Sequence, residues 1–252
     1  MKIKLLTILL ALAACLSLVA CSADDTEKSI QCNERPSALL LPSEDYGDEY
    51  IDSFIFFGES TTYHLKSRGV LRDGTNTKQV WSPKCGTVNL DFTTKDIKII
   101  YPETKEELSV SEAAARSKPE YILFTFGLNG AVQKINKGKD YFKRSYLLLI
   151  NSVKKASPET KIILQSAFPV SNNMDTSSYT VDALTLNSYI DTINNWTAEL
   201  ATEEGLRYLN TSEILKKEDG TLKSAYDSGD GHHLTKEAYI KILTYIRTHG
   251  YK

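Results

Sequence analysis

Three short polar stretches of this sequence hold side chains that together could perform nucleophilic chemistry. A serine hydroxyl becomes a nucleophile when a base takes its proton, and a histidine oriented by a carboxylate is a common base. The stretch "FFGEST" places Ser60 directly after an apolar run, and "DGHHLT" places Asp230 three residues before His233. A turn at Gly231 would let the carboxylate accept from the imidazole and leave the other ring nitrogen free. The spacing therefore predicts a serine, histidine and aspartate site.

The third stretch is "GLNG", in which Asn129 follows another apolar run. Its side-chain amide could donate a hydrogen bond to a developing oxyanion. Each signal has a plain alternative, because asparagine between glycines also forms turns and Ser60 could simply cap a helix. The elbow G-x-S-x-G is absent, since Thr62 occupies its second glycine position. An α/β-hydrolase is therefore not expected, and the site hypothesis depends on the three stretches acting together.

The chain contains four histidines, and the three besides His233 also need an interpretation. His64 follows the serine by about one helical turn and is expected to face solvent, although it could line the pocket. His249 is expected at the surface of the last turn. Asp230, His232 and His233 could instead ligate a metal, but no second Cys/His/Asp cluster is present to complete the shell. We expect neither a metal nor an organic cofactor.

The elements that must position these residues follow from hydrophobic periodicity. Strands are predicted at 53–57, 120–126, 160–168 and 206–210, and helices at 139–156, 181–205 and 235–250. Continuous apolar strands separated by helices indicate an α/β domain whose parallel sheet is covered on both faces. Ligands bind beyond the carboxyl ends of such strands, which is where "FFGEST" and "GLNG" fall, while "DGHHLT" precedes the last helix.

The segment 69–117 fits this alternation less well. Residues 87–92 and 97–102 have strand patterns, 105–110 could extend them, and 111–118 has the pattern of a short helix. We expect an inserted hairpin here.

The N-terminus has the layout of a secretory signal, with a basic start, an apolar core and small residues before a cysteine. "LVAC", ending at Cys21, resembles a bacterial lipobox, in which the cysteine is acylated. "LAAC", ending at Cys15, also fits, but cleavage there would leave apolar sequence at the new terminus. We expect a signal peptide at 1–20, a tether and lead-in at 21–50 and the domain at 51–252. The exported protein would be held to the outer side of the cell membrane by lipid on Cys21.

A transmembrane anchor is the alternative to cleavage, although no second apolar run of about 20 residues follows. Loss of Cys15 and acylation of Cys21 leave Cys32 and Cys85 of the four cysteines. An exported protein can oxidise such a pair, so these two form either a disulfide or two separate thiols. The chain carries 30 basic and 32 acidic residues without a dense basic cluster, so nucleic acid is not an expected partner.

The ordered set "FFGESTT", "FTFGLNG" and "DGHHLT" resembles the blocks of the SGNH (GDSL-type) hydrolase superfamily, over residues 52–250. The resemblance implies a flavodoxin-like three-layer α/β/α sandwich with a mainly parallel sheet, and esterase or deacylase chemistry. It also implies Ser60 as nucleophile, His233 as base, Asp230 as its partner and Asn129 as an oxyanion donor. The family's glycine block is matched by Gly86 in "KCGTV" or by Gly69 in "SRGV". We favour Gly86, so that Ser60, Gly86 and Asn129 would form the oxyanion hole.

Two positions depart from the family pattern. The usual aspartate before the serine is Glu59, and the usual aspartate after the asparagine is Gly130. The resemblance and the export signal together lead us to expect a serine esterase that removes small acyl groups from envelope or extracellular glycans. The alternatives are an O-acyltransferase that uses the same residues and a surface glycan-binding lipoprotein whose site no longer turns over.

Overall fold

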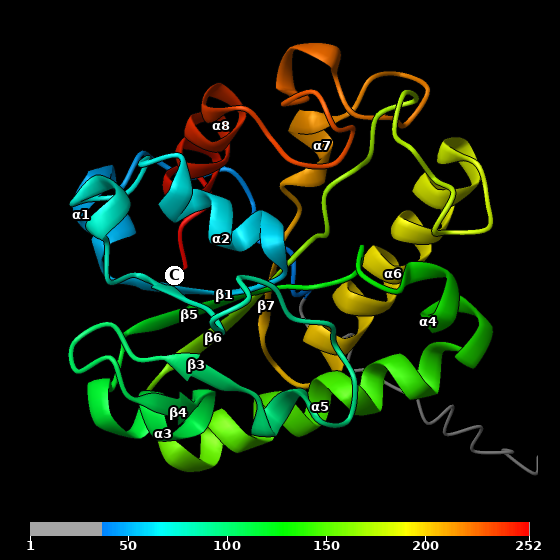
Figure 1. The fold of residues 1–252 in the computed structure, drawn as a ribbon. Coiled ribbons are helices and arrows are strands. Elements are labelled where there is room, and N and C mark those ends of the chain that lie inside the picture. Colours follow the sequence, from blue (N-terminus) through cyan, green and yellow to red (C-terminus); the bar gives the residue numbers. More distant parts are fainter. Residues whose placement is uncertain (1–36, 252) are drawn as a thin grey trace, which may run out of the picture. The chain divides into compact units, whose positions relative to one another are not determined.

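A five-stranded parallel sheet runs through the computed structural model, which describes residues 37–251 (Figure 1). Its strands are β1 (Phe54–Gly58), β2 (Val80–Trp81), β5 (Tyr121–Thr125), β6 (Lys161–Gln165) and β7 (Arg207–Leu209). They are ordered β2-β1-β5-β6-β7, and every neighbouring pair is parallel. This is the flavodoxin-like order, and it confirms the predicted fold class. Ligands of such sheets bind where the strand order reverses, here between the carboxyl ends of β1 and β5.

Helices cover both faces of this sheet (Figure 1). One face carries α1 (Gly47–Asp52), α2 (Ser60–Ser67), α7 (Ser212–Leu215) and α8 (Lys236–Arg247), and the other carries α3 (Val110–Ser117), α4 (Ala131–Lys137), α5 (Lys139–Ala156) and α6 (Ala183–Glu203). Short 3-10 helices lie at Gly74–Asn76, Thr94–Asp96 and Ser224–Tyr226. Successive strand residues point to opposite faces, so Phe57 and Phe124 pack in one core layer while Phe56 and Leu123 pack in the other. The three predicted long helices correspond to α5, α6 and α8.

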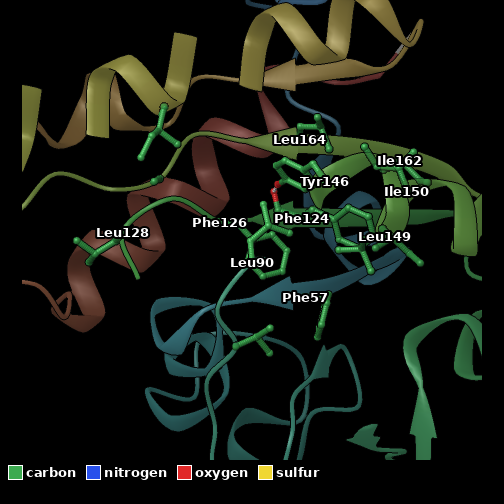
Figure 2. Packing of buried hydrophobic residues seen from close by; sticks show 14 of the residues in the cluster. Phe57, Leu90, Phe124, Phe126, Leu128, Tyr146, Leu149, Ile150, Ile162 and Leu164 are labelled. Carbon is green, nitrogen blue, oxygen red and sulfur yellow. Dashed lines mark hydrogen bonds between the residues drawn. The ribbon is translucent and has the colours of Figure 1, made fainter. Parts of the chain in front are cut away.

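The core layer beneath α5 is rich in aromatic rings (Figure 2). Phe126 and Tyr146 meet edge to face with their ring centroids 5.6 Å apart. The buried Tyr146 hydroxyl donates to the carbonyl oxygen of Phe124 at 3.3 Å, as a buried phenol requires. Truncating one of these rings to alanine would cost about 3–5 kcal/mol. The layer thus holds β5, the strand that leads to Asn129, in a fixed position.

The described part of the predicted lead-in, residues 37–50, belongs to the folded unit. Ala38 and Leu40 are buried. The Leu40 amide donates to the Tyr208 carbonyl at 2.9 Å, and the Tyr208 amide donates to the Ala38 carbonyl at 2.8 Å. This segment therefore pairs with β7, and the predicted domain start at residue 51 is too late. The sequence did not predict that this segment is part of the fold, because it is polar and acidic and few of its side chains are buried.

The inserted hairpin is confirmed, although one of its predicted strands is wrong. β3 (Lys98–Ile100) and β4 (Glu107–Ser109) pair antiparallel in a separate two-stranded sheet. Residues 87–92 form no strand; part of this segment lies instead against the site described below. The second strand of the main sheet is β2, whose two residues were too few to give a periodic pattern.

The predictions for the N-terminus lie outside the described residues: the signal peptide at 1–20, Cys21 and Cys32. Cys85 is described and is exposed. Within residues 37–251, no helix combines the length and the apolar character needed to cross a bilayer.

Candidate active site

The turn after β1 brings Ser60 to the switch point of the sheet. β1 lies so close to β5 that a Cβ at Gly58 would come within 2.3 Å of the Thr125 carbonyl oxygen and 2.5 Å of Thr62 Oγ1. Only glycine fits there. Ser60 is the first residue of α2, and Glu59 is the N-cap residue. The Ser60 hydroxyl does not cap the helix, because its Oγ lies 3.0 Å from Nε2 of His233.

The loop before α8 supplies the two groups on the other side of this hydroxyl. His233 Nδ1 lies 2.7 Å from Oδ2 of Asp230, whose Oδ1 accepts from the His233 and His232 amides at 2.8 and 3.1 Å. Partial burial would raise the pKa of Asp230, but these hydrogen bonds hold it well below its usual range. The structure thus joins Ser60, His233 and Asp230 in one hydrogen-bonded chain, in which the carboxylate fixes the imidazole.

A buried carboxylate supports the loop that carries Asn129. Glu59 is 2% exposed, and its two oxygens accept from the amides of Gly127, Leu128 and Asn129 at 2.9, 3.1 and 3.1 Å. Burial raises the pKa of Glu59, against the lowering effects of the Lys134 charge and the three amides. The residue that departs from the usual aspartate therefore has a structural role, because its longer side chain ties the end of β1 to the loop after β5.

The second departure, Gly130, fits the same loop. Its φ is +66°, a conformation that favours glycine. A Cβ there would lie 3.3 Å from Oδ1 of Asn89, which itself accepts from Lys134 Nζ at 2.7 Å. The buried lysine also donates to the carbonyl oxygen of Asn129. Lys134 and Asn89 therefore fill the space beside the loop in which a side chain at position 130 would lie.

Two hydrogen-bond donors converge on a single oxygen beside Ser60. The Ser60 amide donates to Thr87 Oγ1 at 3.1 Å, and Asn129 Nδ2 donates to the same atom at 2.9 Å. Asn129 Nδ2 also donates to the Val88 carbonyl at 3.1 Å. Sequence reasoning missed Thr87. The available signal was its place directly after the predicted glycine, in a segment that fitted no regular strand.

The amide of Gly86 is not among these donors. It donates to the Pro83 carbonyl at 2.9 Å within a turn, so its proton is already engaged. The geometry does not support the predicted place of Gly86 in an oxyanion hole. The next residue, Thr87, faces the site instead.

His64 lies against the site, whereas the sequence favoured a solvent-facing position. Its half-buried ring stacks on that of His233, with centroids 4.2 Å apart and planes at 23°. Burial first, and then repulsion from His233, lowers the pKa of His64 to about 4. A neutral ring thus packs on the imidazole. His249 was also expected at the surface and is buried, where it stacks on Tyr245 with centroids 3.7 Å apart.

Asp230, His232 and His233 also form a candidate cation site, since one possible ligand atom from each lies within 4.8 Å of the others. Both ring nitrogens of His233 already lie at hydrogen-bond distance from Asp230 and Ser60. A metal would have to break one of these contacts. The absence of a metal stays a prediction.

A flavodoxin-like sheet with a serine and a histidine meeting beyond its strand ends is the layout of an α/β/α hydrolase. A family model for the GDSL-like lipase/acylhydrolase family matches residues 56–240, and the chain belongs to this family. It is an SGNH-type carboxylic ester hydrolase, as the sequence motifs predicted. Comparison with curated proteins gave no match.

Several solved structures resemble this chain at low sequence identity, one of them with a TM-score above 0.5. A candidate lipolytic protein of the G-D-S-L family from Desulfitobacterium hafniense matches with a TM-score of 0.52 and 14% identity, over 77% of this chain and 97% of that one. A candidate platelet activating factor from Streptococcus pneumoniae gives a TM-score of 0.48 and 18% identity, over 76% and 81%. A candidate acylhydrolase from Bacteroides fragilis gives 0.47 and 16%, over 76% and 82%.

Proposed function

We propose that this protein is a serine esterase that releases small ester-linked acyl groups, with Ser60 as nucleophile, His233 as base and Asp230 as the residue that orients the base. The observation that carries the proposal is the chain of contacts at 3.0 Å from Ser60 Oγ to His233 Nε2 and at 2.7 Å from His233 Nδ1 to Asp230. Both distances lie within the range for proton transfer by a positioned base.

The reaction proceeds through an acyl-enzyme. Ser60 Oγ attacks the ester carbonyl carbon while His233 Nε2 takes the hydroxyl proton. The resulting tetrahedral intermediate breaks its bond to the alcohol oxygen, which receives the proton from His233. A water molecule then attacks the acyl carbon, gives its proton to His233, and releases the acid as Ser60 is protonated again.

The converging donors beside Ser60 supply the electrostatic part of the mechanism. The Ser60 amide and Asn129 Nδ2 both point at Thr87 Oγ1, so an oxygen already occupies the position where two donors can stabilise negative charge. The substrate's carbonyl oxygen would take this position after the Thr87 side chain rotates away. Asn129 thereby keeps its proposed role as an oxyanion donor. Thr87, rather than Gly86, is the third residue that contacts the proposed oxyanion position.

The small size of the acyl group is part of this proposal. Export, lipid attachment at Cys21 and acylated envelope glycans as substrates belong to the same proposal. Metabolic labelling with a fatty acid, compared between the wild type and Cys21→Ser in a bacterial host, tests the attachment.

Hydrolysis of p-nitrophenyl acetate tests the proposed residues. Asn129→Ala should lower kcat about 100- to 1000-fold, since it removes one oxyanion donor, and Ser60→Ala should abolish the acyl-enzyme. Both variants should keep the wild-type unfolding temperature. Full activity in both variants would overturn the proposal.

Two further experiments test the alternatives. We expect a chelator to leave the activity unchanged, and loss of activity on chelation would favour the metal alternative. Transfer of the acetyl group to an added sugar, in place of acetate release, would identify an acyltransferase.

A further inference from the structure

A cavity of about 530 Å³ opens directly beside the proposed oxyanion donors. Thr87 and Asn129 line the end of the cavity nearest the donors. Thr87 Oγ1 accepts from Asn129 Nδ2 and from the Ser60 amide. The remaining walls come from Asn89, from α4 and from the segment 178–180. The volume lies within the ~300–1,000 Å³ range of small-molecule sites. A group bound here would be joined to the reacting carbonyl by a short link.

The lining of this cavity carries no charged side chain and combines polar groups with apolar surface. It contains no aspartate, glutamate, lysine or arginine. The side-chain amides of Gln133 and Asn136, both exposed, and the hydroxyl of Tyr179 have no hydrogen-bond partner within residues 37–251, so their donors and acceptors are available to a ligand. An anionic headgroup or a phosphate would find no cation among these side chains.

Two features give the cavity a defined shape at the segment 178–180. Tyr179 lines the cavity, is half-buried and packs against the core layer that contains Phe126. Thr180 has a φ of +63°, which is uncommon for a β-branched residue. Such strained positions gather at ligand-binding sites, where surrounding contacts hold them in place.

We infer that this cavity binds an uncharged sugar unit, the alcohol portion of an acylated glycan substrate. The inference rests on the proposed function and names the substrate class of the same site. Carboxamides and hydroxyls can donate to and accept from the hydroxyl groups of a sugar, and the Tyr179 ring offers an apolar face to the C–H groups of a pyranose. The ester bond would then lie at the inner end of the cavity, next to Ser60, with the small acyl group on the other side of the carbonyl.

The matched substrates are p-nitrophenyl acetate, whose alcohol is not a sugar, and an uncharged mono-O-acetylated cello-oligosaccharide. In the double variant Gln133→Leu/Asn136→Leu, both amides are replaced by apolar groups of similar size. We expect KM for the acetylated oligosaccharide to rise at least tenfold, with kcat within about twofold of the wild type, because the lost contacts are made in the ground state and the transition state alike. Kinetics with p-nitrophenyl acetate should stay the same. Asn151→Leu, an exposed amide on α5 away from the cavity, serves as the control.

The outcomes separate the cavity from the proposed catalytic residues. If the variant hydrolyses the acetylated oligosaccharide with the wild-type KM, the sugar subsite is wrong while the serine esterase stands. Rejection of the oligosaccharide by an enzyme that cleaves p-nitrophenyl acetate would also refute the subsite. A gain of activity on p-nitrophenyl octanoate in the double variant would show that the cavity holds the acyl chain instead. Only retention of esterase activity by Ser60→Ala would remove the proposed function itself.

Discussion

The two sides of the candidate site are held by opposite means. On the oxyanion side, Glu59 is 2% exposed and binds three successive amides of the loop that carries Asn129. On the base side, the Asp230 side chain is 46% exposed, and its loop includes local hydrogen bonds to Asp227, whose Oδ1 accepts from the amides of Gly229 and Gly231 at 2.8 and 2.9 Å. One side is built into the core, and the other lies at the surface.

This difference predicts how the two sides respond to mutation. A buried carboxylate that loses its partners leaves unsatisfied polar groups in the interior, which lowers stability. An exposed carboxylate can exchange its partners for water at small cost. Changes at Asp230 should therefore affect mainly the reaction and lower stability less than changes at Glu59, which should affect both folding and reaction.

The largest effect should come from the base side. Asp230→Asn keeps the size of the side chain but no longer stabilises the imidazolium, and we expect kcat on p-nitrophenyl acetate to fall on the order of 1,000- to 10,000-fold. The free energy of unfolding should fall by less than it does after a change at Glu59. Urea titration and steady-state kinetics measure the two quantities. A variant that loses less than tenfold in kcat would show that the carboxylate does not orient His233.

The oxyanion side should give a smaller kinetic effect and a larger thermodynamic one. Glu59→Gln turns an amide group toward three backbone donors, and we expect the free energy of unfolding to fall by about 2–4 kcal/mol. Because Asn129 loses its fixed position, kcat should also fall about 10- to 100-fold. Glu120→Gln, on the surface, is the matched control and should change neither. Wild-type stability in Glu59→Gln would contradict the contrast between the two sides.

The ring of His64 adds a pH dependence to the base side. Its folded pKa is about 4, and its unfolded value is about 6.5. Between these values the unfolded chain binds the proton and the folded chain does not, so this residue lowers stability progressively as pH falls from about 6.5 to 4. His64→Phe keeps a ring against His233 but cannot titrate. Thermal unfolding from pH 7 to 4.5 should show a smaller loss of stability in His64→Phe than in the wild type; parallel curves would contradict the assignment.

The smallest effect should come from Thr87, whose Oγ1 accepts from both the Ser60 amide and the Asn129 side chain. If its Oγ1 only occupies the carbonyl position, Thr87→Ala should lower KM for p-nitrophenyl acetate by up to about fivefold, because a hydrogen bond of about 1 kcal/mol no longer competes with the substrate. Thr87→Ser keeps the hydroxyl and should resemble the wild type. A tenfold or greater loss of kcat in Thr87→Ala would instead mean that the hydroxyl donates to the oxyanion.

The sequence predicted the parts of the fold that follow from regular periodicity. The apolar runs that became β1, β5, β6 and β7 and the amphipathic runs that became α5, α6 and α8 were identified because each is buried in a repeating pattern. β2 and the pairing of residues 38–40 with β7 depend on two or three residues each. Too few side chains are involved to produce a period, so tertiary contacts alone define these elements.

The same limit applies to the site. Ser60, Asn129, Asp230 and His233 could be named because their residue types stand in characteristic turns at the ends of elements, and the structure brings them together. The orientation of single side chains could not be predicted. Whether Gly86 or Thr87 faces the site is decided by one turn with Pro83, and the stacking of His64 on His233 is decided by packing.

Covalent labelling tests the serine assignment most directly. A fluorophosphonate reacts with a serine only when a base removes its proton, and the adduct can be located by peptide mass spectrometry. We predict one adduct, on Ser60, which forms at least 100-fold more slowly in His233→Ala and is absent from Ser60→Ala. An adduct on another residue, or labelling that is equally fast without His233, would contradict the assignment of Ser60 and His233 as nucleophile and base.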